Sequence, residues 1–396
     1  MQTQNPVFIP GPTNIPERLR QAMDRPTWDH RAPDFADFLQ PLLNDVKPVF
    51  GTTQGEIVIF PSSGSGGLEA ALINTLSPGD LVLSANYGVF SKRWIDLCER
   101  YGLEILGAQA EWGRGVPVEA FRQALAEDDR HRIKAVLVCH NETSTGVTSD
   151  IAAVRALLAE TGHPALLMVD GISSIASIEF NMDAWGVDVA VAGSQKGFML
   201  ATGLAIVAIS QKALAAAGSA SLPRGYFDIG DMLAAHRAGS FPYTAPVNLL
   251  CGLRAAIDML QEEGLPQVYR RHRRIADGIR NAIQGWGLAL CAQDAAEYSN
   301  TVSTIMLPEG FDSDRLVRHA YQRYQTSYGL GLAQLSGRAF RIGHLGQLSE
   351  ADALSGIAVA EMAMRDLEIP VTSGSGVAAA EAFFRQNPCI DKSSLS

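Results

Sequence analysis

The fold is indicated most clearly by one stretch, Val187-Asp188-Val189-Ala190-Val191-Ala192-Gly193-Ser194-Gln195-Lys196-Gly197. Its first six residues are almost entirely apolar, which is typical of a strand covered on both faces in a mostly parallel sheet. Its last five residues are small or polar, and they place Lys196 just after that strand. Because open α/β sheets bind ligands at the carboxyl ends of their strands, we predict that Lys196 belongs to a functional site.

Six further apolar runs lie before and after this stretch and alternate with segments long enough to form helices. They are IVIF (57–60), LVLSA (81–85), EILGA (104–108), AVLVC (135–139), LLMVD (166–170) and LAIVAI (204–209). This alternation predicts an α/β domain with about seven strands, in which helices cover both faces of a mostly parallel sheet. The expected large domain is therefore a three-layer αβα structure.

The pattern changes after Pro246 to long helical segments at 249–263 and 265–286, followed by a strand candidate at 301–306. We predict a second, smaller C-terminal α+β domain there. The expected division is an N-terminal arm at 1–20, a large domain at 21–255 and a small domain at 256–390. Residues 391–396 are expected to form a frayed tail.

Composition limits the classes of partner. The 396 residues are 47% hydrophobic and 19% charged, with a formal net charge of −10, so the chain can bury a large core but gives no general attraction to nucleic acid or anionic membranes. No apolar run reaches the roughly 20 residues that cross a bilayer, and residues 1–12 lack the features of a signal peptide. We expect a cytoplasmic protein that acts on small molecules.

The five cysteines are an odd number and show no CxxC spacing, so we expect neither a metal site nor a disulfide framework.

A candidate phosphate site follows the run IVIF. The turn Pro61-Ser62-Ser63-Gly64-Ser65-Gly66-Gly67 leads into a helical pattern that starts at Leu68. Small residues at a strand-to-helix turn let backbone N–H groups converge on an anion, and the helix dipole favours negative charge there. The turn matches neither the Walker A pattern nor the dinucleotide pattern G-x-G-x-x-G.

Asp170 and Lys196 follow two predicted strands of the same sheet, at the edge where the phosphate turn is also expected. Pyridoxal 5'-phosphate (PLP) requires these three features. A lysine amine binds the cofactor covalently and later moves protons, a carboxylate keeps the pyridine nitrogen protonated, and a cradle holds the phosphate. The three features together predict a PLP site with Lys196 and Asp170 as its catalytic residues.

Several motifs, in this order along the chain, resemble those of the class V, fold-type I aminotransferases. They are Pro10-Gly11-Pro12-Thr13-Asn14, the SSGSGG turn, His140-Asn141-Glu142-Thr143 with Thr145-Gly146, Val169-Asp170-Gly171, Gly193-Ser194-Gln195-Lys196, and Phe340-Arg341-Ile342-Gly343-His344. The similarity runs from about Phe8 to Ala380 and is greatest to the branch that contains serine-glyoxylate and aspartate-glyoxylate aminotransferases. It implies the fold-type I PLP-transferase fold.

The resemblance also implies roles for matched residues in the site. Ser65, Gly66, Gly67 and Gln195 would bind the cofactor phosphate, Phe90 would stack on the pyridine ring, Thr143 would bind the 3' oxygen, Asp170 the ring nitrogen, and Arg341 the substrate carboxylate. Tyr243 and Thr244 would reach the phosphate of a neighbouring subunit. A homodimer with composite active sites is therefore implied.

The implied reaction is transfer of an amino group from a small L-amino acid to glyoxylate, which gives glycine and a 2-oxo acid. L-Aspartate is the first candidate donor and L-serine the second, with an alanine-glyoxylate enzyme as a further alternative. Aspartate requires a second cation for its side-chain carboxylate. His30 and Arg31 are the candidates for that contact.

Two other classes of function are less favoured. A PLP lyase or cysteine desulfurase needs a nucleophilic cysteine on a mobile loop, and neither Cys291 nor Cys389 has a glycine-serine loop or basic neighbours. The rival from another class is a doubly wound NAD-dependent enzyme or a binding module without cofactor. The NAD-dependent enzyme would carry the dinucleotide fingerprint, which is missing.

Overall fold

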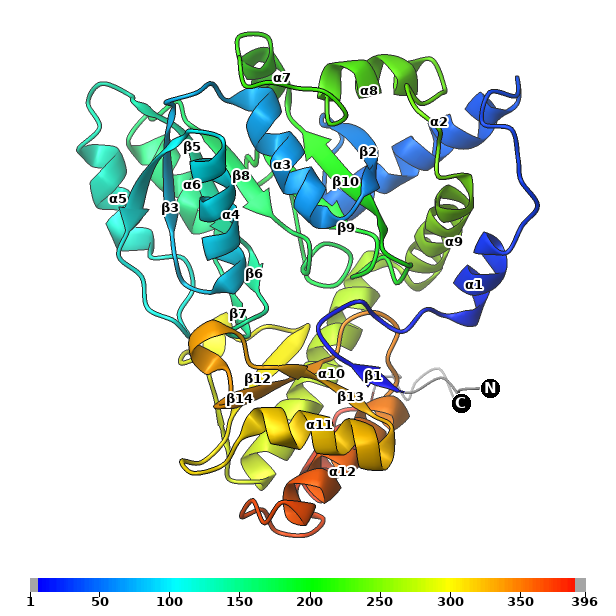
Figure 1. Ribbon diagram of the computed structural model, residues 1–396, viewed down its shortest axis with the longest axis vertical. Helices are drawn as coiled ribbons and strands as arrows, with labels where there is room; N and C mark the ends of the chain where they lie inside the picture. Colours follow the sequence, from blue (N-terminus) through cyan, green and yellow to red (C-terminus); the bar gives the residue numbers. More distant parts are fainter. Residues whose placement is uncertain (1–5, 389–396) are drawn as a thin grey trace.

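The computed structural model describes residues 6–388, so the predictions for Cys389 and for the tail at 391–396 lie outside the described residues. Figure 1 shows two bodies along the long axis, with a large sheet above and a smaller sheet below.

The large sheet has seven strands in the order β2, β10, β9, β8, β5, β3, β4. Their bounds are β2 Glu56–Ser62, β3 Leu81–Ala85, β4 Glu104–Ala108, β5 Ile133–Cys139, β8 Leu166–Asp170, β9 Val189–Gly193 and β10 Gly203–Ile209. All seven apolar runs form strands, as predicted. Only β10 runs antiparallel to its neighbours, so the prediction of a mostly parallel sheet is confirmed.

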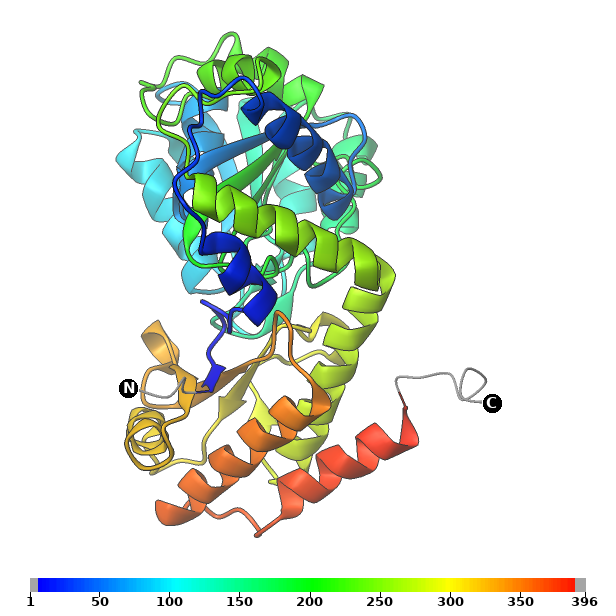
Figure 2. The same cartoon turned by 90° about the vertical axis from the view of Figure 1, so that its right-hand side faces the viewer.

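Helices lie on both sides of this sheet (Figure 2). Those of the large body are α2 Phe35–Val46, α3 Gly64–Thr75, α4 Val89–Arg100, α5 Val118–Ala126, α6 Ile151–Glu160, α7 Gln211–Ala217, α8 Ile229–Arg237 and α9 Val247–Glu263. Helix α3 packs on β9 and β10 and is buried along most of its length, because nearly every residue after Ser65 is small or aliphatic. The three-layer prediction is confirmed.

One apolar run departs from the expected burial. Strand β4 lies at the edge of the sheet, and Leu106 in it is 37% exposed. Its position as an edge strand explains this exposure, because no neighbouring strand lies on its outer side.

The second sheet has the order β1, β13, β14, β12, β11, with bounds β1 Val7–Phe8, β11 Ala289–Leu290, β12 Val302–Met306, β13 Ser327–Leu330 and β14 Ala339–Gly343. Its helices are α10 Leu265–Gly285, α11 Ser313–Tyr324, α12 Glu350–Asp366 and α13 Ser375–Gln386. Strand β1 is parallel to β13, so the N-terminal arm is part of the smaller body. A short helix, α1 Glu17–Met23, then packs on α9 of the larger body.

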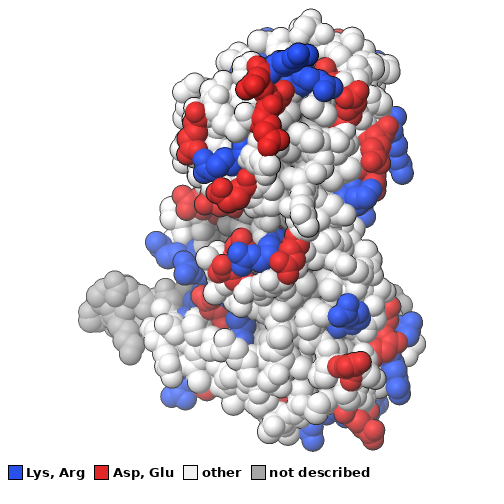
Figure 3. Space-filling model, turned by 90° about the vertical axis from the view of Figure 1, so that its left-hand side faces the viewer, with Lys and Arg blue, Asp and Glu red and all other residues white. Residues whose placement is uncertain are grey.

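Each body has its own hydrophobic core. The first core continues along the chain to Val268, and the second contains Phe8 and then resumes at Ile275, so both cores use residues of α10. The division at residues 255 and 256 remains a prediction. No helix within residues 6–388 is both long and apolar enough to cross a membrane. On the face shown in Figure 3, positively and negatively charged side chains alternate.

Candidate active site

Four strand ends meet at the lower edge of the large sheet, next to the smaller body (Figure 1). Strands β5, β8 and β9 are parallel neighbours that end at Cys139, Asp170 and Gly193. Strand β2 runs in the same direction as β9, because β10 is antiparallel to both, and it leads into α3. The sheet therefore brings the phosphate turn, Asp170 and Lys196 to one edge, as the strand pattern predicts.

Asp170 is 5% exposed. Its Oδ1 accepts a hydrogen bond of 2.9 Å from the Ile172 backbone N–H, and the Cys139 thiol lies 3.9 Å from Oδ2. Burial raises the pKa of Asp170 to about 6, and the Glu142 carboxylate adds to this rise, while Ile172 N–H, Lys196 and Arg93 oppose it. A positively charged group bound next to the Asp170 carboxylate would be strongly stabilised.

Lys196 follows β9 in a tight turn, and its ammonium group donates a hydrogen bond to the Pro10 carbonyl of the N-terminal arm. Desolvation lowers the pKa of Lys196 to about 8, and the nearby Arg341 lowers it further, whereas Asp170 raises it. A substantial fraction of the amine is therefore neutral near physiological pH. Only the neutral amine can attack a carbonyl or accept a proton.

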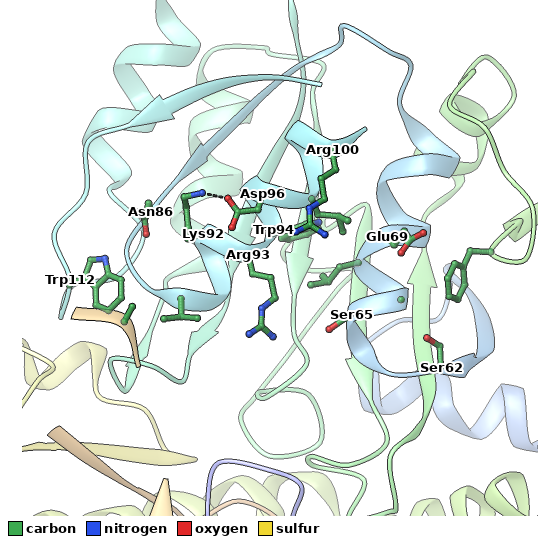
Figure 4. Close-up of a pocket in the computed structure, with 16 residues that line it drawn as sticks. Ser62, Ser65, Glu69, Asn86, Lys92, Arg93, Trp94, Asp96, Arg100 and Trp112 are labelled. Carbon is green, nitrogen blue, oxygen red and sulfur yellow. Dashed lines mark hydrogen bonds and ion pairs between the residues drawn. The ribbon is translucent and has the colours of Figure 1, made fainter. Parts of the chain in front are cut away.

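The phosphate turn begins α3, and no side chain caps the first turn of that helix. Gly66 and Gly67 are closely packed, because a Cβ atom would lie 2.2 Å from Ser62 Oγ in the first case and 2.6 Å from Val191 Cγ1 in the second. Ser65 is exposed and lines a cavity of about 840 Å³, which Figure 4 shows with Ser65 and Arg93 on its two sides. An uncapped N-terminus beside a cavity is suited to a phosphate group.

The side chain of Gln195 also indicates a phosphate site at the start of α3. Within the described residues its buried Oε1 has no hydrogen-bond partner, and a Cβ on Gly193 would lie 3.0 Å from Oε1 and 3.4 Å from Gly64 N at the start of α3. Rotation of the amide exchanges its oxygen and nitrogen, so the side chain can present a donor at this place. The unpaired amide and the uncapped helix fit the phosphate of PLP.

The residues expected on the ring side come from two further elements. Phe90 is the second residue of α4 and is half-buried, with the Arg93 guanidinium 5.1 Å from its ring centroid. Thr143 is buried in the turn between β6 (Asn141–Glu142) and β7 (Val147–Thr148).

Arg341 enters the site from β14 of the smaller body and is 8% exposed. Its Nε donates to the Leu330 carbonyl at 2.8 Å and its Nη1 donates to the Thr143 carbonyl at 3.1 Å. Burial lowers the pKa of Arg341 to about 10, and the Glu142 carboxylate opposes this shift. No described residue accepts a hydrogen bond from Nη2, so this end of the planar group is available for a carboxylate.

Four of the predicted residues come from two further segments, at 30–31 and 243–244. Tyr243 stacks on Tyr226 with ring centroids 4.6 Å apart and donates to the Gly225 carbonyl, and Thr244 is exposed. Arg31 is exposed, and His30 is half-buried. Within residues 6–388 no hydrogen bond or ion pair joins these four residues to Lys196, Asp170 or Arg341.

Sequence reasoning missed the roles of several residues in this site. The carbonyl of Pro10, the thiol of Cys139, the carboxylate of Glu142 and the guanidinium of Arg93 all lie at the site or act on it. The motifs that contain Pro10 and Glu142 were visible in the sequence, whereas Arg93 had no local signal.

Two further observations concern the reactivity of Cys291 and the arrangement of possible metal ligands. Burial raises the pKa of Cys291 to about 11, which leaves little thiolate for desulfurase chemistry. No group of three or more His, Cys, Asp or Glu side chains within residues 6–388 is arranged to hold a metal ion.

The chain is similar in sequence and in structure to known aminotransferases. Residues 21–322 match the family model described as aminotransferase class-V. The chain is 55% identical over 386 residues to L-aspartate–glyoxylate aminotransferase of Paracoccus denitrificans, with 98% of each chain covered. It is 50% identical to serine–glyoxylate aminotransferase of Hyphomicrobium methylovorum, with 98% of this chain and 97% of that one covered. Among solved structures, pyridoxamine–pyruvate aminotransferase from Mesorhizobium loti is 26% identical, with a TM-score of 0.91 over 97% of this chain and 98% of the other.

Proposed function

The chain belongs to the class-V aminotransferases, and we propose that it uses PLP to transfer the amino group of a small L-amino acid to glyoxylate. This proposal rests on three side chains that meet beside one edge of the large sheet. They are Lys196, whose lowered pKa leaves part of its amine neutral, the buried carboxylate of Asp170, and Arg341, whose guanidinium can still bind a carboxylate. The names of the relatives at 50% identity or more support glyoxylate as the acceptor.

Within the proposed site, each residue has a task that its surroundings support. Ser65, Gly66, Gly67 and Gln195 would hold the cofactor phosphate, Phe90 would cover the ring, Thr143 would bind the 3' oxygen, and Asp170 would bind the ring nitrogen. When bound, PLP supplies an electron sink for the carbanion formed at the substrate's alpha carbon. Lys196 would carry the proton removed from that carbon, and Arg341 would orient the substrate through its alpha-carboxylate.

L-Aspartate is the proposed donor, with L-serine second and L-alanine as a further alternative. The relative with 55% identity carries aspartate in its name, and those with 50% carry serine. His30 and Arg31 remain the candidates for reading the donor side chain. We further propose that the protein acts in the cytoplasm.

Two measurements test this function. Borohydride reduction of the yellow protein, followed by peptide mass analysis, should find the cofactor on Lys196, and Lys196→Ala should lose both the label and turnover. The label on Lys212 instead would overturn the assignment. Steady-state rates with aspartate, serine and alanine against glyoxylate should then rank aspartate first by kcat/KM, and a preference for serine would make the protein a serine-type enzyme.

A homodimer with composite sites is the proposed assembly, in which Tyr243 and Thr244 contact the partner's cofactor phosphate. Mixing Lys196→Ala chains with chains altered at both Tyr243 and Thr244 should restore activity, because one site in each mixed dimer would contain every group. If subunits exchange and no activity returns, the sites are not shared.

A further inference from the structure

Glu142 is a fully buried carboxylate to which the function proposed above gives no role. It lies in β6 and accepts hydrogen bonds from four donors. The donors are Phe90 N–H at 3.0 Å, Ser91 N–H at 2.9 Å, Ser144 N–H at 3.1 Å and the Ser144 hydroxyl at 2.6 Å. A buried carboxylate with this many donors has a defined position and orientation.

These hydrogen bonds cap α4 from a different element. The residue before the helix is Gly88, which has no side chain for capping, and Ser144 Oγ accepts from Val89 N–H at 3.0 Å. Three consecutive N–H groups at the start of α4, those of Val89, Phe90 and Ser91, therefore bond to the Glu142–Ser144 pair. The approach is close, since a Cβ on Gly88 would lie 2.2 Å from Glu142 Cδ.

The same carboxylate is next to the substrate-binding side of the site. Thr143 lies between the two capping residues, and its carbonyl accepts from Arg341 Nη1 at 3.1 Å. The negative charge of Glu142 also adds to the rise in the pKa of Asp170 and opposes the fall in the pKa of Arg341.

We propose that Glu142 is a positioning residue that fixes the Phe90 ring and the Thr143–Arg341 contact relative to one another. The proposal rests on the proposed function, because Phe90 and Arg341 are assigned there to the cofactor ring and the substrate carboxylate. Substitution of Glu142 should therefore displace the ring-covering residue and loosen the carboxylate site together.

A purely structural cap is the alternative, and the chain offers a matched control. Glu361 in α12 is buried, accepts from Trp286 Nε1 and Gly376 N–H at 2.9 Å each and from Gly374 N–H, and so caps α13 in the smaller body. It makes the same kind of hydrogen bonds at the far side of the second core. Glu361→Gln should therefore report the stability cost of losing such a cap without a change at the site.

The experiment compares Glu142→Gln with Glu361→Gln and the unaltered protein. Cofactor-free protein is titrated with PLP and followed by visible absorption and circular dichroism, and its thermal unfolding is recorded. Both variants should unfold at lower temperature. Only Glu142→Gln should bind PLP roughly tenfold more weakly or worse, change the circular dichroism of the bound cofactor, and raise the KM for glyoxylate.

Ser144→Ala provides a milder variant if Glu142→Gln does not fold, because it removes only the hydroxyl between Glu142 and Val89. Ser144→Ala should also weaken PLP binding, change the circular dichroism of the bound cofactor and raise the KM for glyoxylate. Unchanged cofactor dichroism and affinity in the folded variants would overturn the proposal, as would an equal change in Glu361→Gln. Failure of the unaltered protein to bind PLP would instead contradict the proposed function.

Discussion

At the scale of single residues, the site pairs a carboxyl group of raised pKa with an amine of lowered pKa. Burial is the main cause of both shifts, since it disfavours the charged form of each group. Their mutual attraction opposes both shifts. With a pKa of about 8, the Lys196 amine can gain or lose a proton near neutral pH, as proton transfer requires, whereas Asp170, with a pKa of about 6, is mostly ionised there.

Asp170→Asn should leave the fold intact and lower kcat by about 100-fold or more, because a neutral amide cannot stabilise a protonated ring nitrogen. Asp183→Asn is a suitable control. Asp183 accepts hydrogen bonds from Thr52 and Thr53, so its loss should lower stability and leave kcat near normal. Near-normal turnover of Asp170→Asn would remove Asp170 from the mechanism.

The lowered pKa of Lys196 predicts how fast cofactor-free protein binds PLP covalently at different pH values. The neutral amine is the reactive form, so the rate should rise as pH increases, by about tenfold per unit below the pKa, and level off above about 8. Stopped-flow absorption measures this rate. A midpoint near the ordinary value of 10.5 would show that the amine is not desolvated in solution.

At the scale of elements, the arm between β1 and α1 connects the two bodies at the site. Pro10 accepts the hydrogen bond from Lys196, and Thr13 N–H donates to the Gln195 carbonyl at 3.2 Å. Gly11 lies between them with a φ of +98°, and a Cβ there would be 2.4 Å from Lys196 Nζ. The arm therefore forms one wall of the lysine pocket.

Gly11→Ala should reduce covalent PLP attachment and kcat because the new methyl group occupies the space of the lysine amine. Gly79→Ala is the control for backbone strain without a steric clash. Gly79 has a φ of +81°, and a methyl group added there would have no neighbouring atom within 4 Å. Both substitutions should cost about 1 to 2 kcal/mol of unfolding free energy. Equal loss of attachment in the two variants would mean that strain, and not the contact with Lys196, is responsible.

At the scale of the whole molecule, buried histidines join α10 to the segment that follows β14. His272 accepts from Gly346 N–H at 3.1 Å and donates to the Val268 carbonyl, and His344 contacts Ser303 and Asn300. Burial lowers the pKa of His272 to about 3 and that of His344 well below its usual value. Both rings are therefore neutral in the folded protein over the physiological range.

These two histidines predict a loss of stability in acid. Unfolded histidine titrates near 6.5, so below that pH the unfolded chain binds protons that the folded chain does not. Each histidine should then lower the unfolding free energy by about 1.4 kcal/mol per pH unit from about 6.5 down toward its folded pKa. Denaturant unfolding at several pH values measures the slope, and His272→Gln should flatten it. An unchanged slope in that variant would contradict the assignment.

The sequence by itself determined the large sheet and the central pair of the site. Strand formation depends on local apolar runs, and the segments after 166–170 and 189–193 contain the glycine and serine that are typical of turns, so Asp170 and Lys196 could be assigned to strand ends from the sequence. The phosphate turn was visible for the same reason, since glycines that start a helix form a local pattern.

The tertiary structure alone decided which distant groups contact one another in that site. Arg341 meets Thr143 across 198 residues, Pro10 meets Lys196 across 186, and Glu142 caps α4 from a hairpin 52 residues away. Contacts of this kind depend on strand order and on the packing of one body against the other. Neither produces a repeating pattern of residues in the sequence. A carboxylate at the N-terminus of a helix was therefore invisible until that helix and its hairpin were placed together.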